Sequence, residues 1–237
     1  MIPWLRPGDA FPPLSQALHD PNGLLAAGGD LSLQSLLQAY RRGVFPWFGE
    51  EDPILWWSPD PRMVLFPDEL HLTRSLRKTL RAQTFEVSAD REFVQVINAC
   101  GGPRDGETGT WITDQMVAAY TELHRAGHAH SIEIWIDGKL AGGLYGVAVG
   151  RAFFGESMFT RVSNASKIAL VALVRQLHAW GFGIIDCQMR TQHLATFGAR
   201  EIPRPEFAQR LSELVDYEPI PAPWRFDSDA IGCRVVN

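Results

Sequence analysis

Two polar residues, Asp186 and Gln188, stand in an otherwise apolar segment, Gly183–Gln188. A short apolar run of this kind is typical of a strand that is buried on both faces. Side chains two positions apart on a strand point to the same face, so the two polar groups are expected to lie together. Buried polar groups need hydrogen-bond partners or a chemical role. The pair is therefore a candidate catalytic site, and the alternative is that it satisfies the backbone of a nearby loop.

A second polar run, Gly155-Glu156-Ser157-Met158, ends the strand expected beside the first and mixes small, acidic and apolar groups. Apolar residues around it could enclose a pocket next to Asp186 and Gln188. They are Leu144, Phe153, Met158, Leu170, Leu173 and Leu177. The alternative is that these are ordinary core residues.

Four cations share one face of the helix expected at Thr73–Ala82, because they fall at i, i+3, i+4 and i+7. They are Arg74, Arg77, Lys78 and Arg81. The net charge of the chain is −5, so overall composition gives no hint of a nucleic-acid partner. The face could be a phosphate-binding stripe or an ordinary solvated surface.

Common motifs for metals and nucleotides are incomplete in this sequence. His124, His128 and His130 lack the zincin spacing, and Gly155–Phe159 lacks the second glycine of a nucleophile elbow. Gly181–Asp186 has Asp where a dinucleotide fingerprint needs its third glycine. We therefore expect neither a metal nor a cofactor.

The elements that must position these residues follow the order β-β-β-α-β over residues 131–188. Asp-Gly at 137–138 predicts a tight hairpin turn between the first two strands. The order favours an α/β (α+β) fold of the GNAT-like acyltransferase type over a doubly wound sheet. The expected segments are Ser131–Trp135, Leu140–Val149, Arg151–Met158, the helix Asn164–Trp180 capped by Ser163 or Asn164, and Gly183–Gln188.

Further elements are expected on both sides of this unit. Strands are predicted at Met63–Phe66, Phe85–Ser88 and Arg200–Pro203, and helices at Arg91–Cys100, Thr113–Arg125 and Pro205–Leu214.

Residues 1–62 are rich in proline, glycine and tryptophan. One helix is expected there, at Ser32–Arg42 with Asp30 or Ser32 as its cap. The rest is interpreted as rigid loops that display aromatic rings, since each proline removes a hydrogen-bond donor. We predict a small Pro/Trp-rich N-terminal domain over 1–62 and a catalytic domain over 63–237.

An acetyltransferase of the GNAT type would carry a glycine-rich loop before the helix at 164, whose amides receive the CoA pyrophosphate. Here the loop Thr160–Ser166 contains no glycine. This predicts an acyl donor other than acyl-CoA. The three cysteines form no disulfide framework, and no segment is apolar enough for a membrane span. A cytoplasmic location, with no membrane partner, is expected.

Several segments resemble the leucyl/phenylalanyl-tRNA–protein transferase family, in order and spacing from about residue 20 to about residue 205. They are Pro21-Asn-Gly-Leu-Leu-Ala26, Gly28-Gly-Asp30, Gly43-Val-Phe-Pro-Trp-Phe48, Ile54-Leu-Trp-Trp-Ser-Pro-Asp-Pro-Arg62, Gly109-Thr-Trp-Ile-Thr113, His128-Ala-His-Ser-Ile-Glu133, Gly155-Glu-Ser-Met-Phe159 and Ile185-Asp-Cys-Gln188.

The resemblance implies an enzyme that moves Leu, Phe and less readily Met from aminoacyl-tRNA to proteins beginning with Arg or Lys, which marks them for degradation by the N-end rule. It implies that Trp47 and Trp111 hold the 3′-terminal adenosine and that Asp186 and Gln188 are the catalytic pair. The implied aminoacyl pocket consists of Leu144, Phe153, Gly155, Glu156, Ser157, Met158, Thr160 and Leu170. Leu173 and Leu177 extend it.

For such a reaction the main task is to hold an activated ester and an amine in attack geometry. The amide oxygen of Gln188 is hardly basic, so it would accept a hydrogen bond from the amine and orient it. Asp186 would orient Gln188, attract a cationic acceptor or take the proton. Two alternatives remain: a CoA-dependent N-acetyltransferase of the same fold, and a tRNA-binding module without catalysis.

Overall fold

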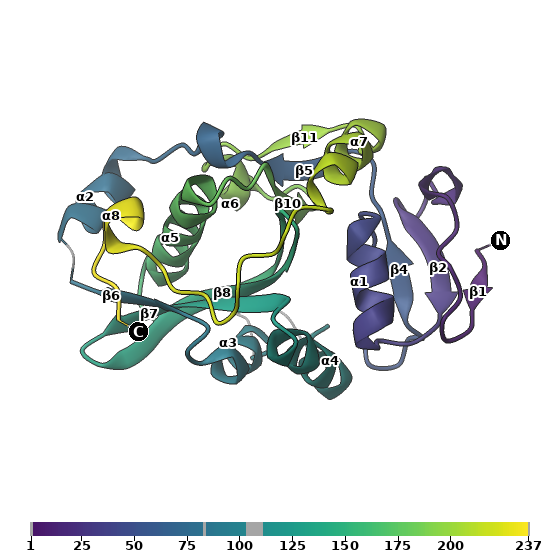
Figure 1. Cartoon of the computed structure of the whole chain (residues 1–237), viewed down its shortest axis with the longest axis horizontal. Helices are drawn as coiled ribbons and strands as arrows, with labels where there is room; N and C mark the ends of the chain where they lie inside the picture. The colour runs from purple at the N-terminus through teal and green to yellow at the C-terminus, as the bar shows by residue number, and fades with distance from the viewer. Residues whose placement is uncertain (1, 83, 103–110, 237) are drawn as a thin grey trace.

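The computed structural model describes residues 2–82, 84–102 and 111–236 and contains two sheets (Figure 1). The smaller sheet has the order β1-β2-β4-β3 and belongs to the N-terminal part of the chain. Its strands are β1 (Trp4–Leu5), β2 (Leu24–Gly28), β3 (Phe45–Pro46) and β4 (Leu55–Trp57).

The N-terminal part was expected to consist of loops around one helix. That prediction left out the short strands. The helix α1 (Leu33–Arg41) is confirmed, with the Ser32 side chain accepting the amide hydrogen of Ser35. The surrounding segments, however, pair as short strands. Every residue of β2 is buried, and the proline of β3 lies on the edge strand of the sheet, where a missing donor is tolerated.

The larger sheet has seven strands in the order β11-β5-β10-β9-β8-β7-β6. Its strands are β5 (Arg62–Leu65), β6 (Glu86–Ala89), β7 (Ala129–Ile136), β8 (Lys139–Val149), β9 (Ala152–Thr160), β10 (Ile184–Gln188) and β11 (Arg200–Ile202). Strand β10 is parallel to β9 and antiparallel to β5. The fold is therefore mixed α/β, as predicted.

Helices cover both faces of this sheet (Figure 1). Helix α5 (Ala165–Ala179) lies on one face, and α3 (Phe93–Cys100) and α4 (Asp114–Arg125) lie on the other. The strands alternate accordingly: Leu144 and Phe153 pack in the core with α5, whereas Tyr145 and Phe154 pack in the core with α3 and α4. This is the period of two expected for strands buried on both faces.

The local signals of the β-β-β-α-β unit are confirmed. Asp137 and Gly138 have φ values of 51° and 70°, as a type I′ turn requires. Asn164 is the cap residue of α5, but it has a φ of 69° and its side chain makes no capping hydrogen bond.

The remaining helices are α2 (Arg74–Ala82), α6 (Gln192–Ala195), α7 (Arg204–Leu214) and α8 (Ser228–Ile231), with single 3₁₀ turns at Leu14–Gln16 and Pro67–Glu69. Within the described ranges, no helix is long and apolar enough to cross a membrane.

The predicted division at residue 62 coincides with the passage from one sheet to the other, since β4 ends at Trp57 and β5 begins at Arg62. One cluster of buried apolar side chains nevertheless includes Leu36 and Trp56 from the first part together with Ile202 and Phe207 from the second. The two parts share a core, and the division into domains stays a prediction.

Candidate active site

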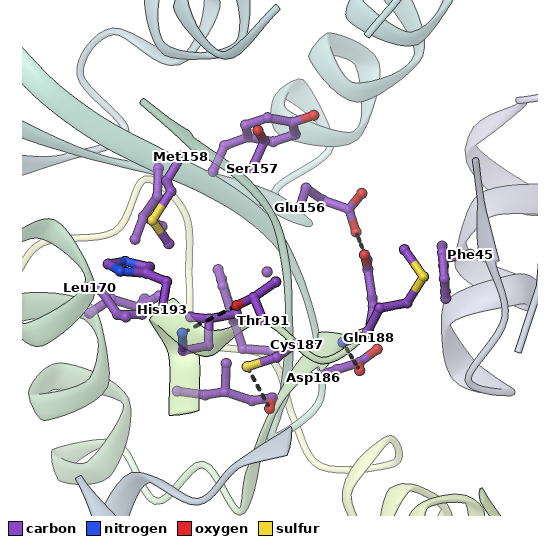
Figure 2. A pocket seen from close by; sticks show the side chains of 18 of the residues that line it. Phe45, Glu156, Ser157, Met158, Leu170, Asp186, Cys187, Gln188, Thr191 and His193 are labelled. Carbon is purple, nitrogen blue, oxygen red and sulfur yellow. Dashed lines mark hydrogen bonds between the residues drawn. The ribbon is translucent and has the colours of Figure 1, made fainter. Parts of the chain in front are cut away.

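A mostly apolar cavity of about 380 Å³ opens where β9 and β10 separate (Figure 2). The two strands pair through Ala152–Phe154 and Ile184–Asp186. Beyond Phe154, β9 continues in register with β8, whereas Gln188 of β10 pairs with Met63 of β5. Helix α5 supplies Leu170 and Leu173 to the wall.

Twelve of the predicted site residues line this cavity. They are Trp47, Trp111, Leu144, Phe153, Gly155, Glu156, Ser157, Met158, Leu170, Leu173, Asp186 and Gln188.

An irregularity in β9 decides which side chains enter the pocket. Tyr145 of β8 pairs with Ser157 and Gly146 pairs with Gly155, so Glu156 is an extra residue on β9. An extra residue of this kind reverses the alternation beyond it. Phe153 and Met158, five positions apart, consequently both line the pocket.

Two predicted pocket residues do not line the cavity. Leu177 of α5 is wholly buried in the core, because it lies one turn beyond Leu173 and away from the opening between the strands. Thr160 is exposed at the end of β9, and its hydroxyl donates to the Val162 carbonyl oxygen at 2.8 Å. Neither residue lines this cavity, and their assignment to the aminoacyl pocket stays a prediction.

Nine further residues of the pocket wall were not predicted from the sequence. Ile185, Cys187 and Met189 are neighbours of the polar pair, so their position in the sequence was a usable signal. No local signal distinguishes the others, which tertiary folding brings together: Phe45, Pro46, Tyr145, Thr191, His193 and Leu194.

Asp186 is fully buried and paired with Arg62, the first residue of β5. Arg62 Nε donates to Asp186 Oδ1 at 2.8 Å and Nη2 donates to Oδ2 at 2.6 Å. The guanidinium also lies 4.9 Å from the ring centre of Phe45 and 4.6 Å from that of Phe207. Both carboxylate oxygens of Asp186 therefore accept hydrogen bonds from the guanidinium of Arg62 in a bidentate ion pair. The sequence analysis did not single out Arg62.

The backbone of β10 departs from a regular strand between Asp186 and Gln188. The register with β5 shifts there, Gln188 has a φ of 62°, and its amide nitrogen donates to Asp186 Oδ1 at 2.8 Å. The simple alternation used to place both side chains on one face does not apply to this backbone. The two residues still lie together, because the carboxylate of one fixes the backbone of the other.

Glu156 and Gln188 face each other across the gap between the strands (Figure 2), with Gln188 Nε2 donating to Glu156 Oε1 at 3.2 Å. The Glu156 carboxylate also accepts hydrogen bonds from Tyr40 of α1 at 2.8 Å and Tyr120 of α4 at 3.0 Å. Burial raises the pKa of Glu156 to about 7, although the two tyrosine hydrogen bonds act in the opposite direction.

Trp47 and Trp111 lie where the pocket meets a wider hollow of about 1000 Å³, which they also line. Trp47 is 40% exposed. Its ring meets that of Trp57 edge-on at 5.6 Å, and Trp57 Nε1 donates to the Trp47 carbonyl oxygen at 2.7 Å. A large ring held at a pocket mouth can stack against a flat group.

The basic face of α2 is exposed, and its four cations do not line the pocket. Arg74, Arg77, Lys78 and Arg81 are all exposed, while Leu76 and Leu80 on the other side are buried. None of the ion pairs recorded among the described residues includes these four cations.

Two of the three clustered histidines, His124 and His130, have hydrogen-bond partners for their Nδ1 atoms. His130 Nδ1 lies 2.8 Å from Asp90 Oδ2, and His124 Nδ1 lies 2.8 Å from the Ala129 carbonyl oxygen. In the part of the chain that the structure describes, no group of three ligands is placed to hold a metal ion.

The fold and the pocket define a mixed α/β protein whose binding site has apolar walls, an aromatic mouth and a few convergent polar groups. Residues 64–212 match the family described as leucyl/phenylalanyl-tRNA protein transferase, and residues 29–60 match its N-terminal domain. The chain belongs to this family and is an aminoacyltransferase.

Curated relatives with the name leucyl/phenylalanyl-tRNA–protein transferase match nearly the full length. The protein of Nitrosospira multiformis is 62% identical over 98% of this chain and 100% of its own. That of Thiobacillus denitrificans is 62% identical over 92% of this chain and 96% of its own, and that of Nitrosomonas europaea 60% identical over 96% of both.

Solved structures are more remote. An aminoglycoside acetyltransferase from an uncultured soil metagenomic sample aligns with a TM-score of 0.38 and 11% identity, over 61% of this chain and 97% of that one. L-PGS from Bacillus licheniformis aligns with a TM-score of 0.37 and 12% identity, over 79% of this chain and 64% of that one.

Proposed function

We propose that this enzyme moves Leu, Phe and less readily Met from aminoacyl-tRNA to the N-terminal amine of proteins that begin with Arg or Lys, in the N-end rule (N-degron) pathway. The observation that carries the proposal is the apolar pocket whose aromatic mouth lies beside Gln188. It provides separate surfaces for an apolar side chain and for the end of a nucleic acid.

The pocket walls fit an apolar side chain that is unbranched at Cβ. Phe153, Met158 and Leu173 offer surface without a fixed polar group, and the cavity of about 380 Å³ has room for Leu, Phe or Met. Because shape alone discriminates by roughly 1–3 kcal/mol per methylene, these substrates would compete rather than exclude one another.

The reaction needs little covalent help from the protein. The amine nitrogen of the acceptor attacks the ester carbon, the bond from this carbon to the ribose oxygen breaks, and the proton lost by the amine ends on that oxygen. The substrate ester is already activated, so positioning of the two groups supplies much of the rate.

Gln188 serves as the group that orients the amine, through a hydrogen bond to its side-chain oxygen. Asp186 serves as the group that orients Gln188. This role is favoured over that of a proton acceptor, since both carboxylate oxygens already bind Arg62 and one also binds the Gln188 backbone.

The tRNA would bind along two surfaces. Trp47 and Trp111 would stack on the 3′-terminal adenosine at the pocket mouth, because base stacking on such rings is worth about 1–3 kcal/mol. The stripe of Arg74, Arg77, Lys78 and Arg81 would follow phosphates of the acceptor stem without reading sequence.

The remaining expectations are part of the same proposal. The larger sheet is a GNAT-like catalytic domain over residues 63–237, supported by its β-β-β-α-β order and by the parallel β9 and β10 that separate at the pocket. Residues 1–62 form its Pro/Trp-rich partner domain. Catalysis would take place in the cytoplasm without a metal or cofactor.

The decisive experiment is the transfer of labelled Leu from charged tRNA to two peptides that differ only in their first residue, Arg or Ala. We expect transfer to the Arg peptide at least tenfold above that to the Ala peptide, and the same preference with labelled Phe. Transfer of an acetyl group from acetyl-CoA, with none from charged tRNA, would support a CoA-dependent enzyme instead. No transfer to either peptide would refute the proposal.

A further inference from the structure

A buried cluster of phenols joins the N-terminal part of the chain to the pocket. Tyr40 on α1 and Tyr120 on α4 are both 0% exposed. Their hydroxyls donate to opposite oxygens of the Glu156 carboxylate, Tyr40 to Oε1 and Tyr120 to Oε2. The two hydroxyls also contact each other. Three elements far apart in the sequence thus meet at one carboxylate.

The protons available to this cluster limit its charge states. Tyr40, Tyr120 and Glu156 are joined by three contacts between oxygen atoms, one for each pair of groups. The two tyrosine hydroxyls have only two protons to donate to these contacts. Burial raises the pKa of both tyrosines well above the usual value, so both stay protonated. The ionised Glu156 therefore accepts both of these protons, and none is left for the contact between the two hydroxyls.

The charge on Glu156 decides how the Gln188 amide is turned. An ionised carboxylate can only accept hydrogen bonds, so it must face the amide nitrogen of Gln188, as the contact of 3.2 Å between Nε2 and Oε1 shows. The Gln188 oxygen then points away from Glu156. A protonated Glu156 can instead donate to that oxygen and withdraw it from the pocket.

We propose that Tyr40 and Tyr120 are positioning residues for aminoacyl transfer, which hold Glu156 in the orientation and charge state that turn the Gln188 side-chain oxygen toward the attacking amine. The inference rests on the proposed function and extends it to residues outside the pocket wall. It also gives α1 a task in catalysis, because Tyr40 lies on that helix.

Other charges near Glu156 act in opposite senses. Asp186 of β10 raises the pKa of Glu156, and Arg62 of β5 lowers it. These two residues form a closed ion pair with each other, so their effects partly cancel. The two phenols are the neighbouring donors that can be removed without breaking that pair.

The test compares pH profiles of kcat/KM for transfer of Leu to the Arg peptide, with the wild type, Tyr40→Phe and Tyr120→Phe. Each substitution removes one donor from the ionised carboxylate, so the pKa of Glu156 rises and the ascending limb moves to higher pH. We expect a shift of about one pH unit, which lowers the rate at pH 7 about fivefold and restores it above pH 9.

The peptide amine titrates near the same pH, so the informative quantity is the ratio of variant to wild-type rates at each pH. Tyr217→Phe is the matched control, since Tyr217 is 58% exposed and outside the cluster. A ratio that rises with pH for the two buried tyrosines and stays flat for Tyr217 supports the proposal. A ratio that is low but independent of pH overturns it, because loss of structure would give that result.

A second comparison uses the Glu156→Gln background, which removes the carboxylate that the two tyrosines contact. Because residue 156 cannot titrate there, Tyr40→Phe and Tyr120→Phe are expected to leave the shape of the pH profile unchanged, and a shift of the same size as in the native background overturns the proposal. Failure of the wild type to transfer Leu would instead refute the proposed function. Each tyrosine variant tests the proposal independently. If one variant does not fold, the pH profile of the other still decides the question.

Discussion

Arg62 and Asp186 form an ion pair from which water is excluded, with side chains that are 0% and 1% exposed. Asp186 lines the pocket, Arg62 lies behind it, and the Asp186 carboxylate fixes the backbone of Gln188. Buried pairs of this kind contribute little net stability, but the loss of one partner leaves an uncompensated charge. Their value here is the geometry that they impose on β10.

We expect Arg62→Met and Asp186→Leu each to lower the free energy of unfolding by about 3–5 kcal/mol, measured by urea denaturation at pH 7. The double variant should recover a large part of this loss, since no unpaired charge remains. The transfer activity of the double variant should stay low, because the backbone amide of Gln188 loses its acceptor, the Asp186 carboxylate.

An exposed ion pair provides the control for this prediction. The side chains of Arg190 and Glu201 are 62% and 32% exposed, and their charged groups lie 3.1 Å apart. Arg190→Ala should therefore lower the free energy of unfolding by less than about 1 kcal/mol. Strict additivity of Arg62→Met and Asp186→Leu would contradict the coupling that the structure implies.

Helix α5 presents two leucines one turn apart that have different surroundings. Leu173 lines the pocket, whereas Leu177 is enclosed by the core. Both are essentially without solvent exposure, at 1% and 0%. The two residues therefore separate an effect on the pocket from an effect on the core.

Leu173→Ala should enlarge the pocket and raise the ratio of kcat/KM for Phe over Leu by about tenfold. Leu177→Ala should leave this ratio unchanged. Both substitutions should lower the free energy of unfolding by about 2–5 kcal/mol, because each creates a cavity. An equal change of the substrate ratio in both variants would mean that the core, and not the pocket wall, sets the preference.

Across the whole molecule, helix α2, which carries the four exposed cations, lies on the far side of α5 from the N-terminal sheet (Figure 1). The chain carries a net charge of −5, so this face is a local exception. A long polyanion could contact it while its end occupies the pocket.

Reversal of two charges, Arg77→Glu with Arg81→Glu, should raise the KM for charged tRNA and flatten its dependence on salt, since fewer phosphate contacts release fewer counterions. The control is Arg6→Glu with Arg225→Glu, which changes the net charge equally at two other exposed positions. Identical salt dependence in both double variants would assign the effect to net charge alone.

Much of the fold could be predicted because its signals are local. The Asp137-Gly138 turn, the Ser32 cap of α1 and the apolar run of β8 each depend on a few adjacent residues. The β-β-β-α-β order, the polar pair on β10 and the apolar part of the pocket wall followed from such signals, whereas Trp47 and Trp111 were assigned through the family resemblance. The short N-terminal strands did not, since two or three residues carry no periodicity.

Sequence by itself therefore determined most of the longer elements and which of them carry the candidate chemistry. Tertiary structure decided the contacts of that chemistry: Arg62 meets Asp186 across 124 positions and Tyr40 meets Glu156 across 116. It also decided that the extra residue at Glu156 lets Met158 line the pocket and that Leu177 stays in the core. The physical reason is the distance along the chain over which each effect acts. Backbone preferences act over a few residues, whereas the partners of a buried charge depend on the order of strands in the sheet.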